Sequence, residues 1–239
     1  MILINIMKVA LCLYGQPRFY NSASYECLKK EIRDKYDTDI FIHTWFKKDF
    51  KFTCAPWSYL GEVVMPDNTV SDIIELYKPK KIVVDEPGSI DFSEYDQPIT
   101  GDPKNDYLTK NMPQMFYSIY KSHSLMKEYA EENNIKYDFV IKARLDTVVY
   151  NLPDFKEFKE GVIYVPHMDF LHSRGLITDN FSISDYEIAL RISEIYLQLK
   201  KYNYCSYSPE STVSDFCRSN NIITCGMNFQ VGLSRKWQK

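Results

Sequence analysis

The chain has 239 residues, of which 45% are hydrophobic and 26% are charged, and its formal net charge is −3. This composition is typical of a globular domain, and the slightly acidic balance gives no electrostatic basis for binding nucleic acid. The length suits a single domain over residues 1–239, and no uncharged run approaches the roughly 20 residues of a transmembrane segment.

Strands and helices alternate through the first half of the chain. Residues 8–14 form a continuous apolar run that ends at Gly15 and Pro17, as expected of a strand buried on both faces of a parallel sheet. Spacing and turn residues predict further elements in the order helix 22–36, strand 39–45, helix 70–77 and strand 81–85. This alternation indicates an α/β domain with parallel strands.

The second half begins with a long segment, residues 86–110, that is rich in Pro, Gly, Asp and Ser and has no periodicity. We expect it to be a flexible insertion, either a functional flap or a surface excursion. A helix with an apolar stripe is predicted from Pro113 toward Asn134. The remaining predicted elements are strands 137–143 and 162–165 and helices 186–199 and 212–219. The prediction is a Rossmann-like, mixed but mostly parallel sheet flanked by helices.

Several common catalytic signatures are missing from the sequence. The glycines form neither G-x-x-x-x-G-K-[ST] nor G-x-G-x-x-G, which removes most support for a P-loop ATPase or a dinucleotide oxidoreductase. The histidines form no H-E-x-x-H, and no G-x-S-x-G elbow is present. Zinc-protease and α/β-hydrolase functions are therefore disfavoured.

Charged residues instead follow two strands that should be buried. Arg144 and Asp146 lie at the carboxyl end of the strand in KARLD, where a carboxylate can ligate Mg²⁺ or Mn²⁺ beside a nucleotide diphosphate. The alternative is a salt-bridged pair that closes the strand. Gly15, Gln16 and Arg18 leave the first strand, and the Arg18 guanidinium can grip a phosphate in a bidentate manner.

With these residues in place, the chain resembles GT-A glycosyltransferase-like proteins of bacterial surface-polysaccharide loci and of some large viruses. The motifs that carry the resemblance are, in order, ALCLYGQPR, DIFIHTW, MPQMFYSIYKSHSLM, YDFVIKARLD, DNF and SPE. It implies a single-domain GT-A-like fold that moves a sugar from a nucleotide-sugar donor to a hydroxyl of a glycan or other acceptor. It also implies Mn²⁺ or Mg²⁺ as cofactor.

In the resemblance, Arg144-Leu145-Asp146 looks like the counterpart of the D-x-D that holds a divalent cation against the diphosphate. The first acid of that motif is replaced by Arg144, which either weakens metal binding or neutralises phosphate itself. The implied metal ligands are Asp146 and His167. His167 and His172 flank Asp169, and this cluster could supply either a metal ligand or contacts to the acceptor. The implied donor-binding residues are Gly15, Gln16, Arg18, Gln114, Ser118, Lys121 and Arg144.

Two of these assignments have simpler alternatives: Lys121 suits a solvated helix face equally well, and His43 is better explained as a satisfied core histidine. For an inverting mechanism the resemblance offers Asp179 first and Glu210 second as the catalytic base. A helix N-cap or a plain turn residue is the alternative for Asp179.

Two other functions stay open at this point. A nucleotidyltransferase shares the layout and the need for metal, and a catalytically silent nucleotide- or glycan-binding protein is favoured by the lost first acid of the D-x-D. The six cysteines lack a C-x-x-C pair and follow no signal peptide, so we expect reduced thiols in a cytoplasmic protein, or in the host cytoplasm if it is viral.

Overall fold

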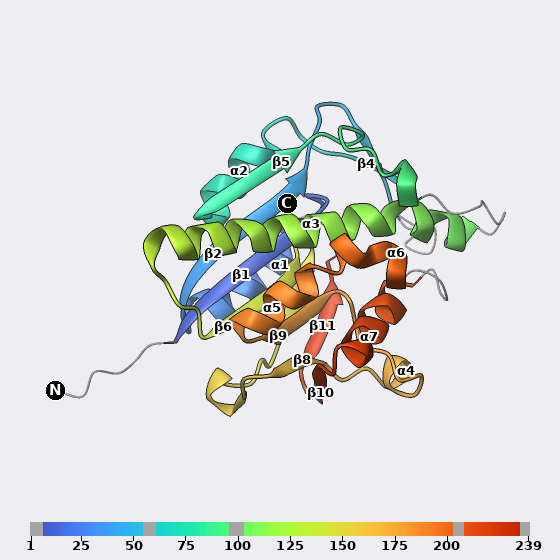
Figure 1. Cartoon of the computed structure of the whole chain (residues 1–239). Helices are drawn as coiled ribbons and strands as arrows, with labels where there is room; N and C mark the ends of the chain where they lie inside the picture. Colours follow the sequence, from blue (N-terminus) through green and yellow to red (C-terminus); the bar gives the residue numbers. More distant parts are fainter. Residues whose placement is uncertain (1–6, 55–60, 96–102, 203–207, 235–239) are drawn as a thin grey trace.

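The computed structural model describes residues 7–54, 61–95, 103–202 and 208–234. Its centre is a seven-stranded sheet in the order β10-β8-β9-β6-β1-β2-β5 (Figure 1). The strands are β1 (Lys8–Gly15), β2 (Asp37–Trp45), β5 (Lys81–Asp85), β6 (Phe139–Arg144), β8 (Val162–Pro166), β9 (Phe181–Ser184) and β10 (Ile223–Met227). Among the described strands of this sheet, only β9 runs antiparallel to its neighbours.

Helices cover both faces of the sheet (Figure 1). Alternate residues of β1 explain this, because Val9 and Leu11 pack in a cluster with helical residues of one layer, whereas Ala10 and Cys12 pack with residues of α3 in the other layer. The first layer contains α1 (Ala23–Leu28), a π-helical turn (Lys29–Arg33) and α2 (Thr69–Tyr77). The second contains α3 (Pro103–Asn133), α5 (Tyr186–Ser193) and α7 (Pro209–Ser219). The expected α/β class with a mixed, mostly parallel sheet is confirmed.

Smaller elements lie around this core. Two antiparallel pairs are formed by β3 (Lys51–Thr53) with β4 (Glu62–Val64) and by β7 (Thr147–Tyr150) with β11 (Gln230–Leu233). The short helices are α4 (Asp169–His172), α6 (Leu199–Tyr202) and the 3₁₀ turns Ser93–Tyr95, Phe155–Glu157 and Tyr196–Gln198. None of the described helices is long and apolar enough to cross a membrane.

Some sequence-based boundaries are wrong. Helix α3 begins at Pro103 and carries Pro113 in its interior, so residues from Pro103 onward do not belong to the predicted insertion 86–110. Both prolines suit a first helical turn, and the polar residues between them hide the helical periodicity. Part of the predicted insertion, residues 96–102, lies outside the described residues. Helix α5 ends at Ser193, and the DNF segment leads into strand β9, which the sequence did not predict.

The order of strands creates a switch point beside β1. The chain passes from β1 to β2 on one side, and α3 later leads to β6 on the other side. Open α/β sheets bind ligands outside the carboxyl ends of the strands at such a point.

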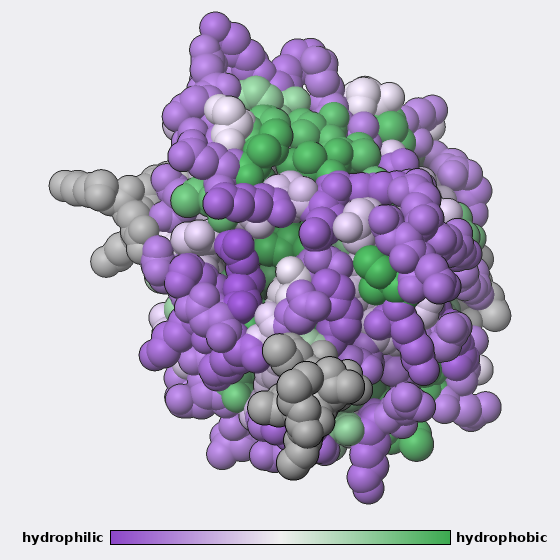
Figure 2. Space-filling model, turned by 90° about the vertical axis from the view of Figure 1, so that its left-hand side faces the viewer, coloured by the Kyte–Doolittle hydropathy of each residue, from purple (hydrophilic) through white to green (hydrophobic). Residues whose placement is uncertain are grey.

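The opposite edge, at the amino ends of the strands, is turned to the viewer in Figure 2 and is mostly hydrophilic. An open hollow at this edge is lined by residues that include Lys136, Asp138, Glu160 and Asp185 and by none of the predicted site residues. An apolar patch lies in the upper part of the view (Figure 2). Gly15 and Arg144 lie instead at the opposite edge, where β1 and β6 end.

Candidate functional site at the carboxyl ends of β1 and β6

The backbone at the end of β1 is open to an approaching group. Gly15 has a φ of +101°, and a Cβ added to it would meet nothing within 4 Å. Its carbonyl accepts a hydrogen bond of 2.8 Å from the Thr44 hydroxyl, which ties the end of β1 to β2. Glycine is needed here for the positive φ, and the lack of a side chain leaves room beside the peptide.

The turn after β1 contains buried polar atoms that lack partners. Gln16 Oε1, Arg18 Nε and Asn21 Oδ1 are all buried with no hydrogen-bond partner among the described residues. Arg18 is 6% exposed, and its Nη1 donates to Cys54 Sγ at 2.8 Å. Buried polar groups in native proteins are nearly always paired. The turn therefore presents donor and acceptor atoms for a water molecule or a ligand group.

Arg144 and Asp146 form a bidentate ion pair at the end of β6. Arg144 Nε donates to Asp146 Oδ1 at 2.9 Å, and Nη2 donates to Oδ2 at 2.8 Å. The Asp146 side chain is 3% exposed and that of Arg144 is 23% exposed. Burial opposes the charge on Arg144, but Asp146 and other nearby acids outweigh it, so the pKa of Arg144 lies above its ordinary value. The salt bridge that was the alternative to cation binding is thus present.

These residues do not fit a divalent cation as they are arranged. Both carboxylate oxygens of Asp146 are engaged by Arg144, and within the described residues no three His, Cys, Asp or Glu side chains converge on one point. His167 Nε2 is instead 3.1 Å from Asp169 Oδ1, and its ring centre is 4.5 Å from that of His172. Among the described residues, Asp146 and His167 make no contact with each other, so the predicted pair of metal ligands is not assembled.

A second group of charges surrounds the buried hydroxyl of Tyr14. This hydroxyl donates to the Asp179 carbonyl oxygen at 3.0 Å, and Lys142 Nζ donates to the same oxygen at 2.7 Å. Burial raises the pKa of Tyr14, and the neighbouring acids, Asp179 first, raise it further, while Arg144 opposes them. Glu210 also acts on this hydroxyl, so both predicted catalytic acids lie near the end of β1.

Asp179 has an environment suited to proton transfer. Its side chain is buried, and burial followed by the negative charge of Glu210 raises its pKa to about 6, while Lys142 and Arg144 lower it. Glu210 lies in the first turn of α7 and accepts a hydrogen bond from the Ser208 hydroxyl. Asp179 is not a helix N-cap, because Asp185 caps α5. A carboxylate with such a pKa is ionised at neutral pH and is a better base than an exposed one.

Three predicted donor-binding residues on α3 lie in different surroundings. The Ser118 side chain is completely buried; its hydroxyl is 2.8 Å from His43 Nδ1 and accepts a hydrogen bond of 2.8 Å from Trp45 Nε1. Ser118 therefore has no surface to offer a ligand. Gln114 donates to the Lys110 carbonyl oxygen within its own helix, and the Lys121 ammonium lies 6.0 Å from the centre of the Tyr117 ring.

His43 connects Ser118 to Asp85, whose Oδ2 lies 3.0 Å from His43 Nε2. The arrangement has the residue types of a Ser-His-Asp triad, but a fully buried serine hydroxyl that already accepts a bond from Trp45 cannot reach a substrate. Burial lowers the pKa of His43 to about 4. The interpretation of His43 as a satisfied core histidine is confirmed.

Sequence reasoning missed Tyr14 and Lys142. A lysine inside the apolar strand segment Phe139–Arg144 was the available signal, because a buried lysine needs a partner. Burial lowers the pKa of Lys142 to about 8. Tyr14 gave no comparable signal, because a tyrosine at the end of an apolar strand is common in cores.

Comparison with models of known protein families and with curated proteins finds no match for this chain.

Proposed function

We propose that the protein is a glycosyltransferase with a GT-A-like fold that transfers a sugar from a nucleotide-sugar donor to a hydroxyl of a glycan or other acceptor. The observation that carries the proposal is the meeting of two charged pairs at the β1–β6 switch point. Arg144 with Asp146 lies at the end of β6, and Asp179 with Glu210 lies beside the hydroxyl of Tyr14. The order of the sequence motifs supports the nucleotide-sugar donor.

The chemistry follows from these charges. The acceptor hydroxyl gives its proton to the Asp179 carboxylate while its oxygen bonds to the anomeric carbon of the donor sugar. The bond between that carbon and the diphosphate oxygen breaks, and the diphosphate leaves with the bonding electron pair. The guanidinium groups of Arg144 and Arg18 stabilise the negative charge that develops on it. No step of this mechanism passes through a divalent cation.

The test is incubation of the protein with UDP, GDP, CDP and dTDP sugars and a set of glycan acceptors, with measurement of free nucleoside diphosphate. We expect release that depends on acceptor and is lost in Asp179→Asn. Release that does not depend on the acceptor and persists unchanged in both Asp179→Asn and Glu210→Gln would indicate a contaminating hydrolase. Formation of pyrophosphate would favour a nucleotidyltransferase, and binding without any release would favour the silent nucleotide-binding protein.

A further inference from the structure

The ion pair at the end of β6 has a net charge that argues against a bound divalent cation. Two carboxylates at these positions would carry a charge of about −2 and attract a cation, whereas Arg144 with Asp146 carries a charge of about zero. A divalent cation at Asp146 would also lie next to the Arg144 guanidinium, which repels it. The arginine thus supplies positive charge at the place where a cation would otherwise supply it.

The guanidinium is held in one orientation. Nε and Nη2 both donate to Asp146, and no other hydrogen bond of the Arg144 side chain is present among the described residues, so Nη1 remains for a ligand. The backbone beneath the pair is fixed as well: Arg144 N donates to Thr147 Oγ1 at 3.1 Å, and Ser234 N donates to the Asp146 carbonyl oxygen at 2.7 Å. A charge fixed in advance stabilises a developing negative charge without reorganisation.

The partly exposed side chain of Arg144 allows a ligand to reach it, whereas the nearly complete burial of Asp146 does not. Lys142 lies two residues earlier on the same face of β6 and adds a second buried positive charge. Of the Arg144–Asp146 pair, the guanidinium and not the carboxylate is therefore the group that a diphosphate can contact.

We propose that Arg144, oriented by Asp146, binds the diphosphate of the donor in place of a divalent cation, so that donor binding and transfer need no metal. This inference rests on the proposed function. The Arg144–Asp146 pair would then neutralise the negative charge of the diphosphate, as a metal ion would otherwise do.

The first experiment uses the unaltered chain. UDP, GDP, CDP and dTDP are titrated into it by calorimetry, once in EDTA and once in Mn²⁺, and Mn²⁺ alone is titrated with detection by electron paramagnetic resonance. We expect one nucleotide to bind equally well in both buffers, with no protein-bound Mn²⁺ signal. Nucleotide binding that disappears in EDTA would overturn the inference and leave the proposed function standing. Absence of nucleotide binding in both buffers would contradict this inference and the proposed function.

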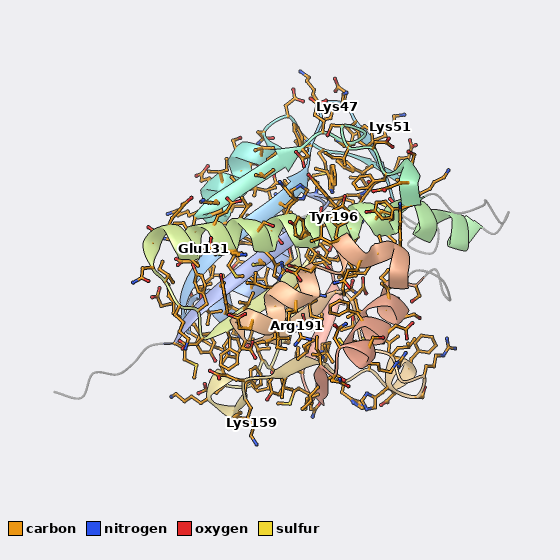
Figure 3. All side chains as sticks on the ribbon, in the orientation of Figure 1. Lys47, Lys51, Glu131, Lys159, Arg191 and Tyr196 are labelled. Carbon is orange, nitrogen blue, oxygen red and sulfur yellow. The ribbon has the colours of Figure 1, made fainter. Side chains whose placement is uncertain are left out.

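The second experiment uses variants whose folding is checked by circular dichroism. Arg144→Gln should weaken nucleotide binding in EDTA about 10- to 100-fold, as expected for loss of a charge-assisted contact. Arg144→Lys keeps the positive charge but loses the two parallel N–H donors of the guanidinium. Its nucleotide affinity in EDTA should therefore lie between those of Arg144→Gln and the parent. The matched control is Arg191→Gln, which removes an exposed guanidinium on α5 and should change nothing (Figure 3).

The third variant reverses the charge. Arg144→Asp should bind the nucleotide poorly in EDTA, recover part of the affinity in Mn²⁺ and show a protein-bound Mn²⁺ signal, because it restores two carboxylates at this strand end. Equal affinities of Arg144→Asp and the parent in EDTA would contradict the assigned role of Arg144, and this comparison does not depend on turnover.

Discussion

Asp179 places a buried carboxylate just before the start of β9, near a second acid, Glu210, and two cations, Lys142 and Arg144. Its main-chain carbonyl is held by Tyr14 and Lys142, so the position of the carboxylate depends on residues of β1 and β6. An acid with a pKa of about 6 is ready to accept a proton at neutral pH without being fully exposed to water.

We expect Asp179→Asn to lower turnover by about two to four orders of magnitude, the range for loss of general acid-base catalysis, with little change in donor affinity. Steady-state rates at saturating donor and calorimetric titration of the same preparations measure the two effects separately. Glu210→Gln is the companion variant. Loss of turnover in Glu210→Gln alone would make Glu210 the base, and loss in neither variant would favour a mechanism without a protein base.

The buried Arg18 side chain makes few hydrogen bonds within the protein. Because its Nε has no partner among the described residues and its Nη1 bonds only to the Cys54 thiol, Arg18→Ala removes little hydrogen bonding from the protein itself. We expect donor binding to weaken by about 1.5 to 3 kcal/mol, the usual value of a charge-assisted contact. Stability should change less than affinity.

Calorimetric titration and urea unfolding of Arg18→Ala decide this point. Arg33→Ala is a suitable control, since Arg33 also donates one hydrogen bond, to the Leu76 carbonyl oxygen, but lies in the helical layer and outside the site. Equal donor affinity in Arg18→Ala and the parent would show that the polar atoms of this turn serve water and not the donor.

At the scale of elements, α3 is joined to the sheet by a small polar network. Ser118 connects His43 and Trp45 of β2, and Asp85 of β5 completes it through the His43 ring. The apolar stripe of α3 would pack against many sheets equally well, whereas these hydrogen bonds fix its register over β2 and β5. The position of α3 relative to the site therefore depends on Ser118.

Ser118→Ala leaves the Trp45 N–H without a partner in a buried place and should cost about 1 to 3 kcal/mol in the free energy of unfolding. Donor affinity should stay close to that of the parent, because the serine has no exposed surface. Urea unfolding and nucleotide titration measure the two effects. A large loss of affinity with unchanged stability would restore Ser118 as a donor-binding residue. Ser122→Ala on the same helix is a control, since its hydroxyl bonds within α3.

The strands and helices that the sequence predicts well have a clear apolar pattern, and those that it does not predict have a weak one. Strand β1 has an unbroken apolar run ended by Gly15, which allows few other conformations. Strand β9 has four residues and no apolar run, so only its pairing with β6 and β8 makes it a strand. The start of α3 at Pro103 precedes the apolar stripe, and the polar residues before Pro113 hide the helical periodicity.

The residues of the site also differ in how far the sequence predicts them. Arg144 and Asp146 stand out in sequence because charges at the end of an apolar strand need an explanation, and the structure shows them paired. The neighbourhood of Asp179 and Glu210 with Tyr14 could not be predicted, because it depends on β9 and α7 reaching the end of β1. Ser118 looked available because helical spacing does not tell which face is buried.

At the scale of the whole molecule, buried histidines make stability depend on pH. Burial lowers the pKa of both His43 and His123 to about 4, from an ordinary value of 6.5. Each histidine therefore stabilises the fold fully above about pH 6.5, and this contribution is lost as the pH falls toward 4. Asp179 acts in the opposite direction, since its raised pKa favours the folded state at low pH.

Because two histidines oppose one carboxyl group, we expect the free energy of unfolding to fall by about 1 to 3 kcal/mol when the pH is lowered from 6.5 to 4. Urea unfolding at half-unit steps of pH measures it. Asp179→Asn should make the fall steeper, because it removes the carboxyl group whose protonation stabilises the folded state as the pH falls. A stability that is constant or rises over this interval in both the parent and Asp179→Asn would show that the two histidines are charged in the folded protein.

The pairing of β7 with β11 has a consequence for the time course of folding. Strand β7 directly follows the Arg144–Asp146 pair, and its partner β11 comes much later in the chain, with Ser234 bonded to the Asp146 carbonyl oxygen. Contacts between distant segments must overcome loop-closure entropy before they are formed. The backbone around Asp146 is therefore completed late, and a refolding chain should regain its helical signal before it regains the ability to bind a nucleotide.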